Sequence, residues 1–178
     1  MREREQVVVA VLVAAPLGRL TSRVRLQKVV YLLDRLGFDS GFEFEYHHYG
    51  PYSRVLDNAA ADAKALKLIE ERTEFRVRDG ASYSIFELTD KRTPDKTNFG
   101  TLGYDKAKEH IAGFAETNLT VLELAATVDF LWHKEKVSDW RGEVGKRKGV
   151  KVEGGRLEKA IALLGRIGLE PPSSDARS

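Results

Sequence analysis

The sequence predicts an α+β fold whose N-terminal half contains three helices, a strand and a hairpin. Apolar residues recur at helical spacing over residues 26–36, and the period then changes to two over residues 42–48. A second strand-forming segment, residues 74–88, contains Asp79-Gly80, a strong local signal for a β-hairpin. Three helices, one strand and a hairpin follow the element order of a winged helix-turn-helix, with the wing at residues 78–83.

Local signals justify each element of this N-terminal half. The first helix should end before Pro16, because a proline disfavours helical geometry in the preceding residue. Ser22 is the expected N-cap of the second helix and Gly37 its C-cap. The central strand should bury Phe42 and its alternate neighbours and leave Glu43 and its neighbours in water. The expected helices lie at residues 3–14, 23–36 and 54–69, and the central strand at residues 42–48.

The C-terminal half is expected to be helical. A polar loop at residues 89–103 should connect it to the first half, because this segment contains one proline and two glycines. The expected domains are therefore a winged-helix-like core at residues 1–90, a helical part at residues 91–169 that packs on it, and a disordered tail at residues 170–178. Helices are expected at residues 104–116, 120–134, 138–148 and 155–167.

Composition excludes several classes of protein. The net charge of +2 gives no chain-wide attraction to nucleic acid or to anionic lipid. The absence of cysteine excludes disulfides and thiolate sites and fits a reducing compartment. The apolar run at residues 7–15 is about half of a membrane span and has acidic residues before it, so it favours a buried helix. We therefore expect a cytoplasmic protein with no membrane partner.

No catalytic motif is present, and the sequence predicts a protein that is not an enzyme and has no cofactor. Glu43, Glu45 and His47 share one face of the central strand, but alternate residues on a strand lie about 7 Å apart, which fits a metal ion poorly. His47 and His48 point to opposite faces. This face is interpreted as a polar edge, and no metal site is expected. An enzyme that uses Glu43, Glu45 and His47 with a bound metal is the third alternative.

Basic residues define the nucleic-acid alternative. The third helix and the two residues after it, residues 54–71, have a net charge of about −1, which opposes the approach of phosphate. Segment 134–151 contains seven cations and three acids, a local charge of +4. Such runs are typical of solvated helix faces. Alternatively, the segment binds an acidic protein or a nucleic-acid backbone. The candidate nucleic-acid contacts are Arg23, Arg25, Lys28, Arg76, Arg78, Lys146, Arg147 and Lys148.

Two short motifs carry a family resemblance. The segment Leu26-Gln27-Lys28-Val29-Val30-Tyr31-Leu32, followed by Tyr49-Gly50-Pro51-Tyr52-Ser53, resembles the YwgA-like proteins and the related Panacea domain of antitoxins. The resemblance covers about residues 23–70, with a weaker similarity at residues 121–130. It implies an antitoxin or phage-associated protein that holds a partner protein and turns over no substrate. The matching positions, expected mainly to build the scaffold, are Leu26, Gln27, Lys28, Tyr31, Gly50 and Pro51.

The segment around Gly50 is the candidate partner-binding site. Gly50 and Pro51 can form a tight corner on backbone grounds alone. The surrounding rings form an aromatic patch of the kind that is enriched in protein interfaces. The sequence therefore predicts a non-catalytic interaction module with a toxin or phage-related protein as partner. A winged-helix DNA-binding regulator is the alternative, and a homodimer is left open. The candidate partner contacts are Tyr46, His47, Tyr49, Gly50, Pro51 and Tyr52.

Overall fold

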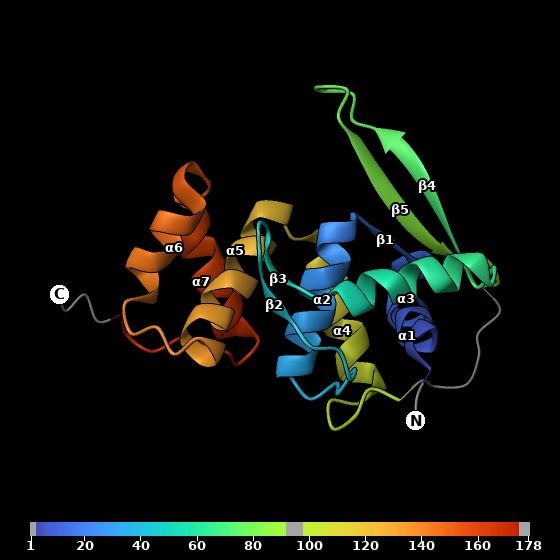
Figure 1. Ribbon diagram of the computed structural model, residues 1–178, viewed down its shortest axis with the longest axis horizontal. Coiled ribbons are helices and arrows are strands. Elements are labelled where there is room, and N and C mark those ends of the chain that lie inside the picture. Colours follow the sequence, from blue (N-terminus) through green and yellow to red (C-terminus); the bar gives the residue numbers. More distant parts are fainter. Residues whose placement is uncertain (1–2, 92–97, 175–178) are drawn as a thin grey trace. The chain divides into compact units, whose positions relative to one another are not determined.

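The computed structural model describes residues 3–91 and 98–174, and within these residues the fold is mixed α+β (Figure 1). The expected fold class is therefore confirmed at this level. The chain divides into two compact units. The first unit contains the chain up to residue 44 and residues 53–116, and the second contains residues 45–52 and the chain from residue 117.

The first unit begins with helices that the periodicity predicted. Ser22 caps α2 by accepting a hydrogen bond from the Arg25 backbone N–H, and Ser53 caps α3 by accepting one from Leu56. The third helix ends four residues earlier than expected, because Lys67 has a positive φ of 59° and the chain then enters a strand at Ile69. The helices are α1 (Arg4–Ala14), α2 (Arg23–Arg35), α3 (Arg54–Ala65) and α4 (Tyr104–Glu116), with a 3₁₀ turn, η1 (Pro16–Gly18).

A three-stranded antiparallel sheet completes the first unit. Its strands are β1 (Arg19–Thr21), β4 (Ile69–Phe75) and β5 (Ser82–Leu88), in the order β1-β5-β4. The hairpin predicted around Asp79-Gly80 is confirmed, and in Figure 1 it extends beyond the helices as the green ribbon. Between the first two helices, for which no strand was expected, residues 19–21 pair with residues 85–87 of β5.

Ser53, the last residue of the second sequence motif, bonds to the first motif inside the first unit. Gln27 Nε2 donates to the Ser53 carbonyl at 2.9 Å, and Gln27 Oε1 accepts from the Ser53 N–H at 2.8 Å. Leu26 and Tyr31 are buried beside it in α2. The expectation that these matching positions form scaffold agrees with their burial.

The expected division near residue 90 falls within the first unit. α4 packs on α1 and α2 through Ala107, Ile111 and Phe114, all of which are buried. The Arg25 guanidinium Nη1 also donates to the Phe114 carbonyl at 2.6 Å. The apolar face of α4, and not the polar loop before it, determines the unit to which this helix belongs. Residues 92–97 of that expected loop lie outside the described residues.

The central strand expected at residues 42–48 is only partly correct. Phe42 and Phe44 are buried while Glu43 and Glu45 are exposed, so the alternation is as predicted for residues 42–45, whereas His48, expected on the buried face, is exposed. The regular strand is shorter, however: β2 (Glu45–His47) pairs only with β3 (Gly50–Tyr52). Upstream the backbone bends at Asp39 and Gly41, both with positive φ, and this segment does not join a central sheet.

The second unit combines this small hairpin with C-terminal helices. Its helices are α5 (Leu119–Asp129), α6 (Trp140–Lys148) and α7 (Arg156–Arg166), with a π turn, η2 (Phe130–Lys134), and a 3₁₀ turn, η3 (Gly149–Val152). β3 and α7 both pack on α5, which is buried from Val121 to Asp129. Among residues 3–91 and 98–174 no helix combines the length and apolar character that a membrane crossing requires.

The tail expected to be disordered is attached to α6 as far as Ser174. Trp140 Nε1 donates to the Pro172 carbonyl at 2.8 Å, and Ser174 Oγ donates to Asp139 Oδ1 at 3.0 Å. These bonds give residues 170–174 a defined position that their composition did not indicate. Residues 175–178 lie outside the described residues.

Candidate functional site

The β2–β3 hairpin carries all six residues of the candidate partner-binding site. Its strands are three residues long and are joined by His48 and Tyr49 at the turn. Tyr49 is 51% exposed, and His47 is also exposed. The His47 and Tyr52 rings lie 4.7 Å apart, centroid to centroid, on one face of the hairpin. All the predicted rings thus lie on one short element, but Tyr46 points to the other face of β2, where it contacts Arg147.

Gly50 lets the hairpin approach α5 closely. Its φ is +86°, a value that favours glycine, and a Cβ at this position would lie 2.4 Å from Thr127 Oγ1. Pro51 is buried and pairs with Tyr46 across the two strands. The corner expected at Gly50-Pro51 therefore has two structural functions, which are a tight turn and contact with a helix.

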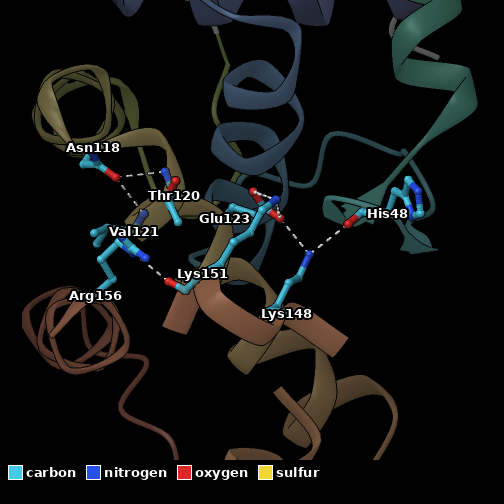
Figure 2. Close-up of polar contacts among 8 residues, drawn as sticks. All are labelled: His48, Asn118, Thr120, Val121, Glu123, Lys148, Lys151 and Arg156. Carbon is cyan, nitrogen blue, oxygen red and sulfur yellow. Dashed lines mark hydrogen bonds and ion pairs between the residues drawn. The ribbon is translucent and has the colours of Figure 1, made fainter. Parts of the chain in front are cut away.

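A buried ion pair anchors the hairpin turn to the helices (Figure 2). Lys148 Nζ lies 2.7 Å from Glu123 Oε1, and these side chains are 1% and 4% exposed. The same ammonium donates to the His48 carbonyl at 3.0 Å. Burial lowers the pKa of Lys148, and its hydrogen bond to Glu123 offsets part of this effect. One buried lysine thus connects α5, α6 and the hairpin.

A second lysine completes the cluster. Lys151 Nζ lies 3.0 Å from Glu123 Oε1 and 4.9 Å from the centroid of the Tyr49 ring. Arg156 supports this turn by donating to the carbonyls of Val150 and Lys151, at 2.7 and 2.8 Å. Lys151 is part-exposed, so it places a cation beside the exposed tyrosine ring.

A shallow hollow of about 580 Å³ lies beside the hairpin, lined by Tyr46, His47, His48 and Arg147. The Arg147 guanidinium stacks 4.4 Å above the Tyr46 ring centroid. Arg147 also pairs with Glu143 at 2.7 Å and Glu135 at 3.0 Å. Burial raises the pKa of Tyr46, so its phenol is a neutral hydrogen-bond donor across the physiological range. The hollow offers aromatic surface with polar atoms at its edge.

The basic segment at residues 134–151 is less charged in the folded protein than in the linear sequence. Arg141 pairs with Glu158 at 2.8 Å, and both lysines of the cluster share the single negative charge of Glu123. Counting these two additional acids reduces the local charge from +4 to +2. Lys146 lies exposed on α6, whereas Lys148 is buried and cannot form part of a surface patch.

The expected basic face of α2 is not a surface cluster. Arg25 is 8% exposed and Lys28 is 1% exposed, so neither cation can approach a phosphate backbone. Burial lowers the pKa of Arg25. Arg23 is exposed and binds Glu71 at 2.7 Å. α4, β1 and α3 pack on α2, and Arg25 and Lys28 are buried in the folded unit.

The wing arginines lie at the turn of the β4–β5 hairpin. Arg76 pairs with Asp79 at 3.0 Å. The pKa of Asp79 is lowered mainly by the hydrogen bond that it accepts from the Ala81 N–H, and less by Arg76 and Arg78. Two apolar residues in this turn region, Phe75 and Val77, are 68% and 105% exposed. The turn is therefore an exposed mixture of cations and apolar side chains.

The remaining polar face does not form a compact site. Glu45 and His47 share one face of β2, while Glu43 lies outside the strand. Within the described parts of the chain no three histidine, cysteine, aspartate or glutamate side chains are grouped as metal ligands.

Glu123 is the residue of this site that the sequence interpretation missed. It stands in the apolar run of α5, where a carboxylate is costly unless a cation is buried with it. An isolated acid among consecutive buried positions was therefore an available signal, but its partner is 25 residues away.

Comparisons of the chain with models of protein families, with curated proteins and with solved structures gave no match. Its function must therefore be inferred from its own geometry and chemistry.

Proposed function

We propose that the protein is a non-catalytic binding module that holds a partner protein through the β2–β3 hairpin. The observation that carries this proposal is the bond from buried Lys148 to the His48 carbonyl, which fixes the turn while the rings beside it stay exposed. A surface that is rigid before binding loses less conformational entropy when the partner docks. The anchor therefore holds Tyr49 in one position before a partner binds.

The composition of the hairpin surface supports a protein partner over a phosphate-rich one. Tyrosine and arginine are enriched at protein interfaces, and they often provide much of the binding energy. The nearby cations Arg147 and Lys151 already contact carboxylates, which makes them less available to a phosphate. With the sequence resemblance, this surface makes a toxin or phage-related protein the candidate partner.

The first test compares two exposed aromatic residues. The tagged chain is expressed in its native host, crosslinked and purified, and co-purifying proteins are quantified by mass spectrometry. Tyr49→Ala is expected to reduce recovery of the partner at least about tenfold, because a truncated interface tyrosine can cost more than 1 kcal/mol. Phe75→Ala, which removes an exposed ring from the other hairpin, is expected to leave recovery unchanged. Equal recovery with both variants would contradict the proposal.

The second candidate function is DNA binding by a winged helix-turn-helix in the first unit. The order α1-β1-α2-α3-β4-β5 and the sheet order β1-β5-β4 favour this interpretation, with the β4–β5 turn as the wing. Arg76 and Arg78 would contact phosphate. The acidic residues Asp57 and Asp62 on α3 oppose it, since a recognition helix must approach DNA closely.

A salt-dependent binding assay tests this second function. If the wing binds DNA, reversing the charge of Arg76 and Arg78 to glutamate should abolish the gel shift at physiological salt. At low salt, where residual binding is measurable, the slope of log affinity against log salt should fall in magnitude by roughly 2, because about one counterion is released per phosphate contact. The same reversal at exposed Lys106 and Lys108 of α4 is the matched control. Absence of any shift for the unmodified protein would remove DNA binding from consideration.

A further inference from the structure

The outer edge of β2 presents unpaired backbone groups. The register aligns Tyr46 with Pro51, which has no N–H. Ladder hydrogen bonds must therefore run through the flanking pairs, Glu45 with Tyr52 and His47 with Gly50. The N–H and C=O of Tyr46 then point away from β3, and within the described parts of the chain no hydrogen bond satisfies them.

We propose that β2 pairs antiparallel with β2 of a second copy of this chain, which extends the small hairpin into a four-stranded sheet, β3-β2-β2-β3. This inference rests on the proposed function, because it assigns a partner to the same hairpin. Free strand edges are established sites for the addition of another strand. A twofold axis through Tyr46 would let its N–H and C=O bond those of the other Tyr46 reciprocally.

The side chains of β2 select this partner and one register. With Tyr46 opposite Tyr46 of the other copy, Glu45 of each copy lies opposite His47 of the other. Moving the register by two residues in either direction would instead place Glu45 opposite Glu45, or His47 opposite His47. Two carboxylates directly opposite each other are destabilising and two imidazoles have no opposite charge to attract them, whereas a carboxylate opposite an imidazole is favourable. The sequence Glu-Tyr-His is therefore complementary to itself only in the central register.

The opposite face of the strand also suits a second copy. Two Tyr46 rings would lie side by side across the new pair, and cross-strand aromatic pairs stabilise sheets. The hollow lined by Tyr46, His47, His48 and Arg147 lies beside the strand and provides polar and aromatic surface for a second copy. Glu45 and His47 are exposed, so both members of the cross-strand pair are accessible.

Charge exchange tests the pairing in the full chain. Sedimentation velocity over a series of concentrations is expected to show a monomer–dimer equilibrium. Glu45→Lys should raise the dissociation constant about tenfold, because two cross-strand pairs are lost together. The double variant Glu45→Lys/His47→Glu restores opposite charges in the same register and should return the constant to near that of the unmodified protein. Glu153→Lys, the same charge change at an exposed site outside the hairpin, should have no effect.

A second pair of variants examines the backbone bonds. Tyr46→Ala removes the ring but keeps the N–H, whereas Tyr46→Pro also removes the donor. Dimerisation should weaken with alanine and be lost with proline, with circular dichroism used to verify that both variants are folded.

The outcomes separate this inference from the proposed function. A chain that is monomeric at every concentration overturns self-pairing, and so does a dimer that tolerates Glu45→Lys. If the chain is monomeric and Tyr49→Ala reduces the recovery of a different co-purifying protein, the binding function stands, and another molecule occupies the β2 edge. If the charge exchange behaves as expected while no other protein binds the hairpin, the self-pairing stands without the toxin or phage-related partner.

Discussion

Replacing Glu123 with leucine is expected to lower the free energy of unfolding by about 3–5 kcal/mol. The substitution leaves the Lys148 ammonium buried without its carboxylate, and only the His48 carbonyl then accepts from it. A buried charge without a counter-charge is one of the most destabilising single changes in a folded protein. Chemical denaturation monitored by the fluorescence of the two tryptophans measures the loss.

Two further variants make this prediction specific. Lys148→Met should cost less, about 1–3 kcal/mol, because Glu123 keeps Lys151 at 3.0 Å. The double variant Glu123→Leu/Lys148→Met removes both buried charges and should lose only about 1–2 kcal/mol, mainly from the missing bond to His48. A double variant at least as unstable as Glu123→Leu alone would show that packing, and not the unpaired charge, dominates.

Gly50→Ala is expected to destabilise the protein by about 2–5 kcal/mol. Part of this loss is the strain of a positive φ in a residue with a side chain, about 1–2 kcal/mol. The remainder comes from the clash of the new methyl group with Thr127 Oγ1, which an ideal Cβ would approach to 2.4 Å.

Gly41 provides a matched control for Gly50. It has the same φ of +86°, but nothing lies within 4 Å of its Cβ position. Gly41→Ala should therefore show only the strain. Adding Thr127→Ala to Gly50→Ala should recover most of the difference, because that hydroxyl has no hydrogen-bond partner in the described residues. Equal losses for the two glycines would disprove the close approach of the hairpin to α5.

Local patterns in the sequence predicted most of the helices and the β4–β5 hairpin. The periodic apolar positions of α2 and the turn-forming Asp79-Gly80 act over a few residues, so their effects can be deduced from neighbours in the chain. β1 was missed because it is three residues long and is defined only by pairing with β5, more than sixty residues later.

The candidate site was predicted less completely, for a similar reason. The sequence indicated the rings of the hairpin, but it gave no sign that Lys28 and Lys148 are buried. Burial of a charged residue depends on distant partners: Glu123 lies 25 residues before Lys148, and the His48 carbonyl lies 100 residues before it. Spacing along a helix cannot reveal such contacts.

The allocation of residues 45–52 to the second unit has a consequence for synthesis on the ribosome. The chain leaves the first unit after residue 44 and rejoins it at residue 53. The hairpin therefore emerges well before its supporting lysine, which is translated roughly 5–20 s later at typical bacterial or eukaryotic rates of chain growth. Until then Tyr49 and its neighbours lack their anchor, so a nascent or C-terminally truncated chain has the first unit's segments but a hairpin whose turn is not fixed.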